Sequence, residues 1–480
     1  MTDVVSAPHQ HAGAVSIDGR RFQFAGTSAD SFEPGGLVVL TAPGTPGTES
    51  TQLGQVEDVT VTLDGTPSGS GRILGLLSAN GRDLDVRRSV AFAAATVRAA
   101  DARTAESLYG TSAATLPIGS FLTSRDIPAR LFAQRFNRHT FWCGQSGSGK
   151  TYALGVVLEQ LLMHTELPMV IFDPNADFVR IRQAQSDGDL SDAQRTLATR
   201  DIRILRPAAG PDALRVRFID LSWRAKAAVF RLDPLDDRAE HNELMHIEET
   251  VGLTDPSRVV PSLRERGTPA ARDLAARTES LRVTDWPVWA QGLAPVTQIL
   301  DARPDATVLD LGGFANPEES LVVALAVLDD LWEKRENRRP LLIVIDEAHN
   351  FCSPEATSPL QVAVRERIVQ IAAEGRKFGL WLLLSTQRPS RVHPSIISQC
   401  DNLALMKMTS PVDLHELATV FGFVPPAMLA RASWFKQGEA LFAGGFVPAP
   451  TMVSMARRLT REGGADVAVP LRAGRDDPAA

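Results

Sequence analysis

The residues best suited to chemistry in this chain form one run, Gly144-Gln145-Ser146-Gly147-Ser148-Gly149-Lys150-Thr151, which fits the pattern G-x-x-x-x-G-K-[ST]. An apolar segment, 141–143, precedes it, and apolar residues at helical spacing follow from Leu154 to Leu162. Glycines let backbone N–H groups approach phosphate oxygens, and the start of a helix adds partial positive charge. We therefore expect a phosphate-binding loop, with Lys150 reaching the β- and γ-phosphates and the Thr151 hydroxyl binding Mg²⁺. The alternative, a chance glycine-rich turn, does not account for the flanking strand and helix.

Two carboxylates follow a second apolar segment, Leu341 to Ile345. A strand that is apolar at every residue belongs in a parallel sheet that is covered on both faces. Asp346, at its end, is placed to support Mg²⁺, and Glu347 is placed to polarise an attacking water. The alternative is a buried strand with a solvated acidic end, which is disfavoured beside a phosphate-binding loop in the same domain.

A third apolar segment, Met169 to Phe172, also leads into acids, Asp173 and Asp177. The carboxyl ends of parallel strands lie at the edge of the sheet where α/β proteins bind their ligands. Both acids are therefore candidates for a network of metal ion and water. The alternative for Asp173 is that it caps the turn that follows.

Two polar residues flank a further apolar segment, Leu380 to Leu384. The Gln387 amide, at its carboxyl end, can hydrogen-bond the γ-phosphate or its water, or it simply forms the turn before Pro389. Arg376 would be a surface residue in a monomer. In a ring it could reach the γ-phosphate of the neighbouring subunit as an arginine finger.

Basic residues also precede the phosphate-binding loop, namely Arg135, Arg138 and His139. At the mouth of a nucleotide site they would favour phosphate, and the alternative is that they are solvated residues at the start of a strand. The sequence leaves both interpretations open.

The elements that position these residues alternate between strands and helices, which predicts an α/β fold with a mostly parallel sheet. The stretch Ser89 to Ala100 is either a last strand of the N-terminal β domain or a helix. Arginines scattered through the helical insertion are more consistent with a solvated face than with a DNA track. Changes in pattern give the following boundaries: a small β-barrel or sandwich for assembly or docking (1–110), the first part of the phosphate-binding domain (111–186), a helical insertion (187–295), the second part of that domain (296–460) and a flexible tail (461–480).

The composition is that of an ordinary globular chain, with 480 residues of which 44% are hydrophobic and 22% charged. Because the net charge is −7, any contact with DNA would need a local basic lining. Cys143, Cys352 and Cys400 form no metal or disulfide pattern, which suits a reducing compartment. The N-terminus lacks a signal-peptide pattern and no apolar run is long enough to span a membrane, so we expect a soluble cytoplasmic protein.

Taken together, these motifs resemble those of the HerA branch of the HerA/FtsK ATPases. The resemblance rests on the phosphate-binding loop, Asp173-Pro174, Ile345-Asp346-Glu347-Ala348-His349, Gly375-Arg376-Lys377-Phe378-Gly379, Ser385-Thr386-Gln387-Arg388-Pro389, and the lead-in residues Leu116-Pro117-Ile118-Gly119 and Arg138-His139. One departure is Asp173-Pro174-Asn175-Ala176-Asp177, where family members usually carry D-P-x-G-E, and it leaves the role of Asp177 open.

The resemblance implies a RecA-like P-loop ATPase core with an N-terminal β-barrel and a helical insertion. It implies ATP and Mg²⁺ as cofactors, a homo-hexamer that hydrolyses ATP at subunit interfaces, and double-stranded DNA in the pore. It also implies a nuclease or other effector docked on the barrel, in DNA end processing or in antiviral defence against phage. The roles it carries over are Lys150 and Thr151 for phosphate and Mg²⁺, Asp346 for the metal, Glu347 as catalytic base, Gln387 as sensor, and Arg376 as the arginine supplied to the neighbour, with Arg138 as a second candidate.

The first hypothesis is therefore an ATP-driven translocase or helicase on duplex DNA. The second is a regulatory ring whose ATP state assembles or activates an effector with little translocation, which the net acidity favours because a DNA pore must be locally basic. A membrane-anchored pump and a small-molecule kinase fit the sequence less well. The sequence does not fix the pore-lining residues, and the segment between Phe351 and Arg367, with Arg365 and Arg367, is a plausible place for them.

Overall fold

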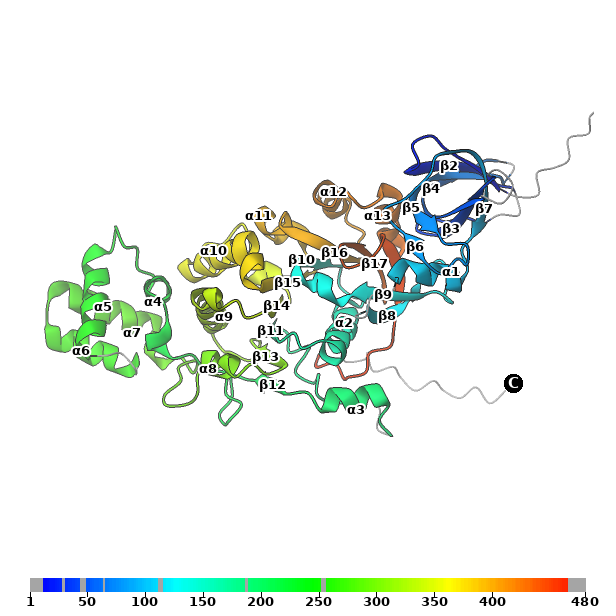
Figure 1. Cartoon of the computed structure of the whole chain (residues 1–480). Helices are drawn as coiled ribbons and strands as arrows, with labels where there is room; N and C mark the ends of the chain where they lie inside the picture. The colour runs from blue at the N-terminus through cyan, green and yellow to red at the C-terminus, as the bar shows by residue number, and fades with distance from the viewer. Residues whose placement is uncertain are drawn as a thin grey trace, which may run out of the picture.

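The computed structural model describes residues 12–27, 31–43, 49–63, 65–110, 115–185, 189–251 and 256–464, without the side chains of 247–251 (Figure 1). From residue 465 onward, the predicted flexible tail lies outside these described residues. The start of that tail is bound to the core, since the backbone N–H of Gly463 donates to the carbonyl oxygen of Asp177 at 2.9 Å. Across the described ranges, no helix is both long and apolar enough to cross a lipid bilayer.

The N-terminal domain is a closed β-barrel. Its strands are β1 (Ala12–Ser16), β2 (Arg21–Ala25), β3 (Leu37–Ala42), β4 (Ser50–Val61), β5 (Pro67–Leu77), β6 (Leu84–Asp85) and β7 (Phe92–Ala99). They pair in the order β2-β1-β7-β3-β4-β5-β6, and a β2–β5 pairing closes the ring. The strands approach closely, because a Cβ on Gly71 would lie 2.3 Å from the carbonyl oxygen of Gln55. The barrel prediction is confirmed, and the ambiguous stretch from Ser89 to Ala100 contains strand β7.

The second sheet is mostly parallel, as predicted. Its strands are β8 (Thr115–Phe121), β9 (Pro128–Phe132), β10 (His139–Cys143), β11 (Met169–Asp173), β12 (Ile202–Leu205), β13 (Ala306–Asp310), β14 (Leu341–Ile345), β15 (Leu380–Thr386), β16 (Cys400–Met406), β17 (Glu439–Gly444) and β18 (Thr451–Met455). Their order is β12-β13-β11-β14-β15-β10-β16-β17-β18-β8-β9, parallel from β12 to β16 and antiparallel beyond. Strands β10, β15 and β14 are therefore neighbours whose carboxyl ends lie at one edge.

Helices cover both faces of this sheet, which explains why its central strands are apolar at every residue. On one face, α2 (Lys150–His164) packs in a core with Trp142 and Val344. On the other face, α9 (Pro317–Glu333) and α10 (Pro359–Glu374) share a core with Phe141 and Ile343. Neighbouring residues of one strand thus enter opposite cores.

The remaining helices are α1 (Ala102–Glu106), α3 (Asp192–Ala198), α4 (Trp223–Val229), α5 (Arg238–Val251), α6 (Val259–Arg266), α7 (Pro269–Leu281), α8 (Val296–Asp301), α11 (Pro394–Ile397), α12 (Pro411–Val420) and α13 (Pro426–Arg431). Helices α5 to α7 and the barrel lie at opposite ends of the molecule (Figure 1). The stretch 187–295 is not helical throughout, because β12 joins the edge of the large sheet. The helical part therefore begins with α4.

Several arginines of this helical part are engaged with acids of the same chain. Arg277 contacts Asp237 and Glu240, both at 2.8 Å, and Arg266 contacts Glu243 at 2.6 Å. Ion pairs that neutralise these side chains within the domain leave little net charge for phosphate contacts. They support the interpretation of a solvated face.

Candidate functional site

The phosphate-binding loop connects β10 to α2 at the carboxyl edge of the sheet, as predicted. Gly147 and Gly149 have φ values of 74° and 83°, in the left-handed region that glycine adopts without strain. A Cβ on Gly144 would lie 2.7 Å from the Cβ of Met406, so a larger residue would not fit there. The loop lines a cavity of about 600 Å³.

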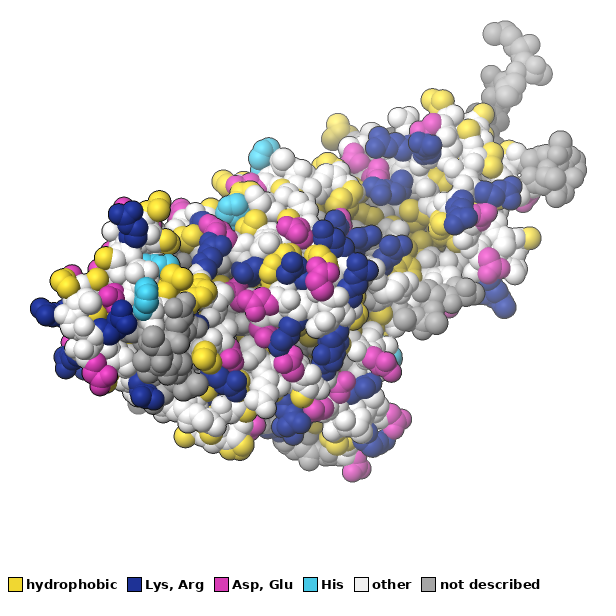
Figure 2. Space-filling view, turned by 60° about the vertical axis from the view of Figure 1, so that its left-hand side comes forward, with side chains coloured by type: hydrophobic (Ala, Val, Ile, Leu, Met, Phe, Trp, Pro, Cys, Tyr) yellow, Lys and Arg dark blue, Asp and Glu magenta, His cyan; other side chains and the backbone are white. Residues whose placement is uncertain are grey.

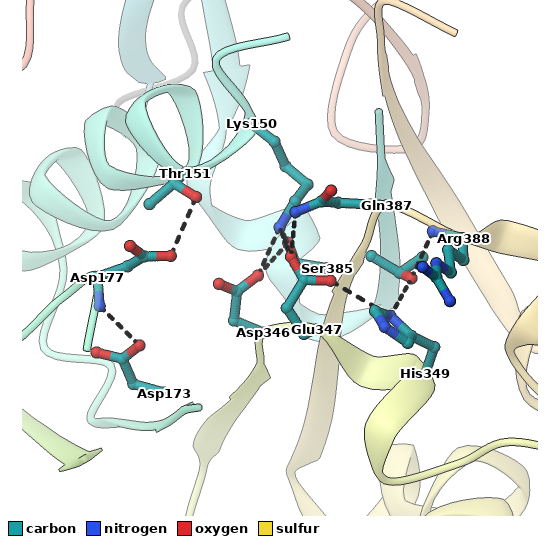
Figure 3. A network of polar contacts seen from close by, with 11 residues as sticks. Lys150, Thr151, Asp173, Asp177, Asp346, Glu347, His349, Ser385, Gln387 and Arg388 are labelled. Atoms are coloured by element: carbon teal, nitrogen blue, oxygen red, sulfur yellow. Dashed lines mark hydrogen bonds and ion pairs between the residues drawn. The ribbon is translucent and has the colours of Figure 1, made fainter. Parts of the chain in front are cut away.

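The side chain of Lys150 contacts residues at the carboxyl ends of β14 and β15 (Figure 3). Its Nζ lies 2.7 Å from Oδ1 of Asp346, 2.8 Å from Oγ of Ser385 and 3.2 Å from Oε1 of Glu347. Burial would lower the pKa of Lys150, but the adjacent carboxylates of Asp346 and Glu347 outweigh it and raise that pKa. The ammonium group is therefore charged at neutral pH, ready to bind phosphate.

Glu347 is held by side chains from the segments that follow β15 and β14. Gln387 Nε2 donates to Oε1 of Glu347 at 2.8 Å, so the predicted sensor and the predicted base are in direct contact. On the other side, Nδ1 of His349 lies 3.3 Å from Oε2 of Glu347 and 3.0 Å from Oγ1 of Thr386. Burial lowers the pKa of His349, which keeps the ring neutral at physiological pH.

Asp173, the last residue of β11, and Asp177, in the turn that follows, have different roles. Both oxygens of Asp173 accept backbone N–H groups, from Asp177 at 2.9 Å and from Phe178 at 2.8 Å, so Asp173 caps the turn. Burial raises the pKa of Asp173 to about 7. Asp177 instead lines the cavity, and the Thr151 hydroxyl donates to its Oδ2 at 3.4 Å.

The departure from D-P-x-G-E leaves this turn intact. Ala176, which replaces the glycine of that pattern, adopts a φ of 60°, the left-handed conformation that suits glycine. The shorter carboxylate of Asp177 still reaches Thr151. The backbone at Ala176 is thus slightly strained in the conformation that places Asp177 at the cavity.

Asp177 should make the activity of this site depend on pH. Burial raises its pKa to about 6, with the charge of Asp346 adding to the effect. Above this pKa the carboxyl is ionised and accepts a hydrogen bond from the Thr151 hydroxyl, whose oxygen lone pairs then face a metal. We expect Asp177→Asn to lower nucleotide turnover roughly tenfold at about pH 8 and hardly at all at about pH 5.

Nucleotide turnover of the wild type and of Asp177→Asn, measured as a function of pH, checks this prediction. Asp192→Asn, at an exposed position, is a matched control. A ratio of wild type to Asp177→Asn that stays constant over the same range would contradict the assignment.

The site suits Mg²⁺ and a triphosphate, on the evidence of its unused polar atoms. Among the described residues, Oδ2 of Asp346 and Oγ of Ser148 are buried without a hydrogen-bond partner, and Oε2 of Glu347 has none besides its 3.3 Å contact with Nδ1 of His349. Asp346 and Thr151 would hold Mg²⁺, whose charge would offset that of the phosphates. The described part of the chain contains no cluster of three or more His, Cys, Asp or Glu for a metal held by protein alone.

Arg376 and Arg138 lie at the opposite edge of the sheet. Arg376, in the turn before β15, contacts Oδ2 of Asp401 at 2.6 Å, and Arg138, just before β10, lies 3.8 Å from the same oxygen. Strand β10 runs from His139 to Cys143, a rise of roughly 13–17 Å, between Arg138 and the phosphate-binding loop. Neither arginine reaches the nucleotide cavity of its own chain.

The interpretation that Arg135, Arg138 and His139 lie at the mouth of the chain's own site is therefore wrong. His139 is fully buried, and its Nδ1 accepts the backbone N–H of Leu382 at 2.9 Å. Residues that precede a parallel strand lie at its amino end, whereas the ligand lies at its carboxyl end.

The arginines expected in a pore are engaged within the chain. Arg367 forms an ion pair with Asp329 at 2.7 Å, and Arg365 donates to the carbonyl oxygen of Pro354 at 3.2 Å. The segment between Phe351 and Arg367 therefore offers less free positive charge than its sequence suggests.

Sequence analysis missed two groups of residues at the site. Ser385 contacts Lys150, His349 contacts Glu347, and Thr386 contacts His349. They stand in the motifs that carry the resemblance, but no role was predicted for them. The far side of the cavity comes from C-terminal residues that no motif marked, namely Gln437, Gly438, Ser454, Met455, Ala456, Arg457, Glu462 and Gly464.

Comparisons with known proteins agree with this geometry. Residues 116–256 match the family model described as "Helicase HerA, central domain". The chain is 30% identical over 156 residues to the DNA double-strand break repair helicase HerA of Sulfurisphaera tokodaii, a match that covers 31% of each protein. It is 21% identical over 402 residues to the helicase of the same name from Pyrococcus furiosus, covering 72% of this chain and 70% of that protein.

Other curated relatives are matched over a smaller part. A probable helicase of Methanocaldococcus jannaschii is 29% identical over 30% of this chain, and the match spans 28% of that relative. Among solved structures, the bacterial conjugative coupling protein TrwBdeltaN70 has a TM-score of 0.52 at 12% identity, covering 77% of this chain and 94% of that one. A likeness at this identity shows a shared fold.

Proposed function

Because this chain carries the core of a HerA-type ATPase of the HerA/FtsK superfamily, we propose that it is an ATP-hydrolysing motor that moves on double-stranded DNA. The observation that carries the proposal is the convergence of Lys150, Asp346 and Glu347 at one edge of the sheet, beside a cavity of about 600 Å³. A cation for phosphate, a carboxylate for the metal and a second carboxylate for water are the parts that hydrolysis requires.

In this proposal each side chain has one task. The backbone N–H groups of the loop and the Lys150 ammonium bind phosphate, and Asp346 and Thr151 hold Mg²⁺. Glu347 accepts a proton from the attacking water. Gln387 keeps Oε1 of Glu347 in place by donating a 2.8 Å hydrogen bond to it. Binding of phosphate would draw Lys150 away from Oε1 of Glu347 and so free that oxygen for water.

We further propose a homo-hexameric ring in which Arg376 acts on the neighbouring subunit. The placement of Arg376 and Arg138 at the amino edge, opposite the nucleotide cavity, suits a head-to-tail arrangement of subunits. In such a ring, the amino edge of one subunit faces the carboxyl edge of the next. Asp401 holds Arg376 in position at 2.6 Å until the neighbour's phosphate competes for it.

Double-stranded DNA is the proposed substrate, supported by relatives that are named as DNA repair helicases. The net charge of −7 does not exclude it, because charge is unevenly distributed on the surface. Figure 2 shows many basic side chains, with acidic ones among them, across the middle of one face of the molecule. A nuclease or another effector, bound to the N-terminal barrel, completes the proposed assembly.

The second candidate function is a regulatory ring that activates an effector with little movement on DNA. The net charge of −7 favours it, because a protein that is acidic overall repels DNA at long range.

Turnover of ATP with and without duplex DNA tests the first proposal against the second. For a motor, duplex DNA should raise turnover several-fold, and Lys150→Ala should abolish both the basal and the stimulated rates. Turnover that is insensitive to DNA, in a preparation that co-purifies with a stoichiometric partner, would favour the regulatory ring.

A further inference from the structure

The C-terminal end of the described chain crosses the nucleotide cavity. After β18, residues 456–464 run back along α2, and we refer to this segment as the strap. Ala456, Arg457, Glu462 and Gly464 of the strap line the cavity opposite the phosphate-binding loop. The strap therefore forms a wall of the site that is distinct from the loop.

A buried acid on α2 anchors the middle of the strap. Glu159 is 1% exposed, and it accepts the backbone N–H groups of Leu459 and Thr460, each at 2.9 Å. The side chain of Arg458 is fully buried, with its Nε 3.6 Å from Oε1 of Glu159. A buried carboxylate that is satisfied in this way fixes the backbone of the strap.

The first turn of α2 is shaped to receive the strap. The Tyr152 hydroxyl accepts the backbone N–H of Arg458 at 2.7 Å. Gly155 leaves the space that the guanidinium fills, since a Cβ there would lie 2.6 Å from Cζ of Arg458. At its far end, the strap packs on the turn of Asp177, because a Cβ on Gly463 would lie 1.7 Å from the carbonyl oxygen of Ala176. The strap is thus held at both ends beside the cavity.

Arg457 differs from the other arginines of the strap. Arg458 pairs with Glu159, and Arg461 donates to the carbonyl oxygen of Ala184. The side chain of Arg457, in contrast, is exposed at the cavity and makes no hydrogen bond or ion pair with any residue that the structure describes. A fixed backbone therefore presents an uncommitted guanidinium to the site.

The position of Arg457 relative to α2 indicates which part of a nucleotide it meets. The loop and Lys150 take the β- and γ-phosphates, which places the α-phosphate and the nucleoside beyond them, over the first turn of α2. That turn contains Tyr152, whose hydroxyl binds the strap next to Arg457. The base and the ribose would then lie against the edge of the cavity that Met455 and Arg457 form.

We propose that the strap is the nucleoside-binding wall of the site and that Arg457 contacts the base and ribose of the bound nucleotide. A planar guanidinium can stack on an aromatic base and donate to ribose hydroxyls at the same time. This inference rests on the proposed function, because it assumes that the loop binds a nucleotide.

Binding of two probes to the full-length chain, measured by calorimetry with Mg²⁺, separates the nucleoside from the phosphates. The probes are ADP and inorganic tripolyphosphate, which has no nucleoside. Arg457→Ala should weaken ADP binding roughly tenfold and leave tripolyphosphate binding unchanged. Because Arg457 is exposed, the variant should keep its fold, and Arg282→Ala serves as a control whose side chain is 81% exposed elsewhere.

The other results overturn the inference. Unchanged ADP affinity would show that Arg457 does not contact the nucleotide, and equal weakening of both probes would show that it binds phosphate. Lys150→Ala gives the reference for the loop, since it should weaken both probes. Should the wild type bind neither probe, the proposed function itself fails, and this is distinct from failure of the strap alone.

Discussion

Replacing Glu347 with glutamine is expected to reduce steady-state ATP hydrolysis by about a thousandfold while ATP binding is retained. The amide keeps the shape of the side chain and can still accept the hydrogen bond from Gln387 Nε2, which now measures 2.8 Å to Oε1. It cannot take a proton from water. The loss should therefore appear in kcat, and a filter or calorimetric assay should show ATP held without turnover.

A matched control is Glu355→Gln, whose side chain is 68% exposed and paired with Arg391 on the surface. It should leave hydrolysis unchanged. If Glu347→Gln retained a substantial fraction of the wild-type rate, the base would have to be sought elsewhere, and the contact of Glu347 with Lys150 would be structural.

The second large effect concerns the edge of the sheet opposite the nucleotide. Arg376→Ala should lower hydrolysis by about a thousandfold, the scale typical of an arginine finger. Its folding should be little affected, because Arg376 is partly exposed and its main partner, Asp401, is nearly half exposed. The loss of hydrolysis should depend on whether the adjacent subunit of the ring supplies an intact Arg376.

Mixing variants tests that dependence. Arg376→Ala and Lys150→Ala are each expected to be inactive alone. In mixed rings, some interfaces combine the intact Lys150 of one subunit with the intact Arg376 of the next, so activity should partly return. The surface variant Arg391→Ala should be active by itself. Failure of the mixture to recover any activity, with mixed rings demonstrated by mass, would rule out an arginine supplied by the neighbour.

The nucleotide-binding centre could be predicted from sequence because its signals are local. The glycines and Lys150 lie in one run between a strand and a helix, and Asp346 and Glu347 directly follow a strand. Apolar content at every residue of β14 indicated a sheet covered on both faces, which the two cores of the structure confirm. Parallel pairing then brings the ends of β10, β14 and β15 to one edge.

The rest of the site depends on contacts between distant parts of the chain. The strap binds Glu159 from about three hundred residues away in sequence, and no periodicity or motif marks such a contact. Glu159 itself was a weak signal, as an acid in a mostly apolar helix. The error over Arg138 had another cause, since nearness in sequence to the loop was taken for nearness in space, although strand β10 separates them.

The helical insertion shows a similar limit. Its helices were expected from composition, but β12, a strand of only four residues, is too short to stand out from the loops around it. Pairing with β13 at the edge of the large sheet, and not a pattern of its own, makes this segment a strand.

Displacement of a triplex-forming strand from duplex DNA tests the central claim most directly, because it reports movement along the duplex and not binding. The account predicts that wild-type protein with ATP and Mg²⁺ releases the third strand, and that Glu347→Gln, which should still bind ATP, does not. ATP hydrolysis by the wild type without any release of the third strand would contradict a motor on DNA.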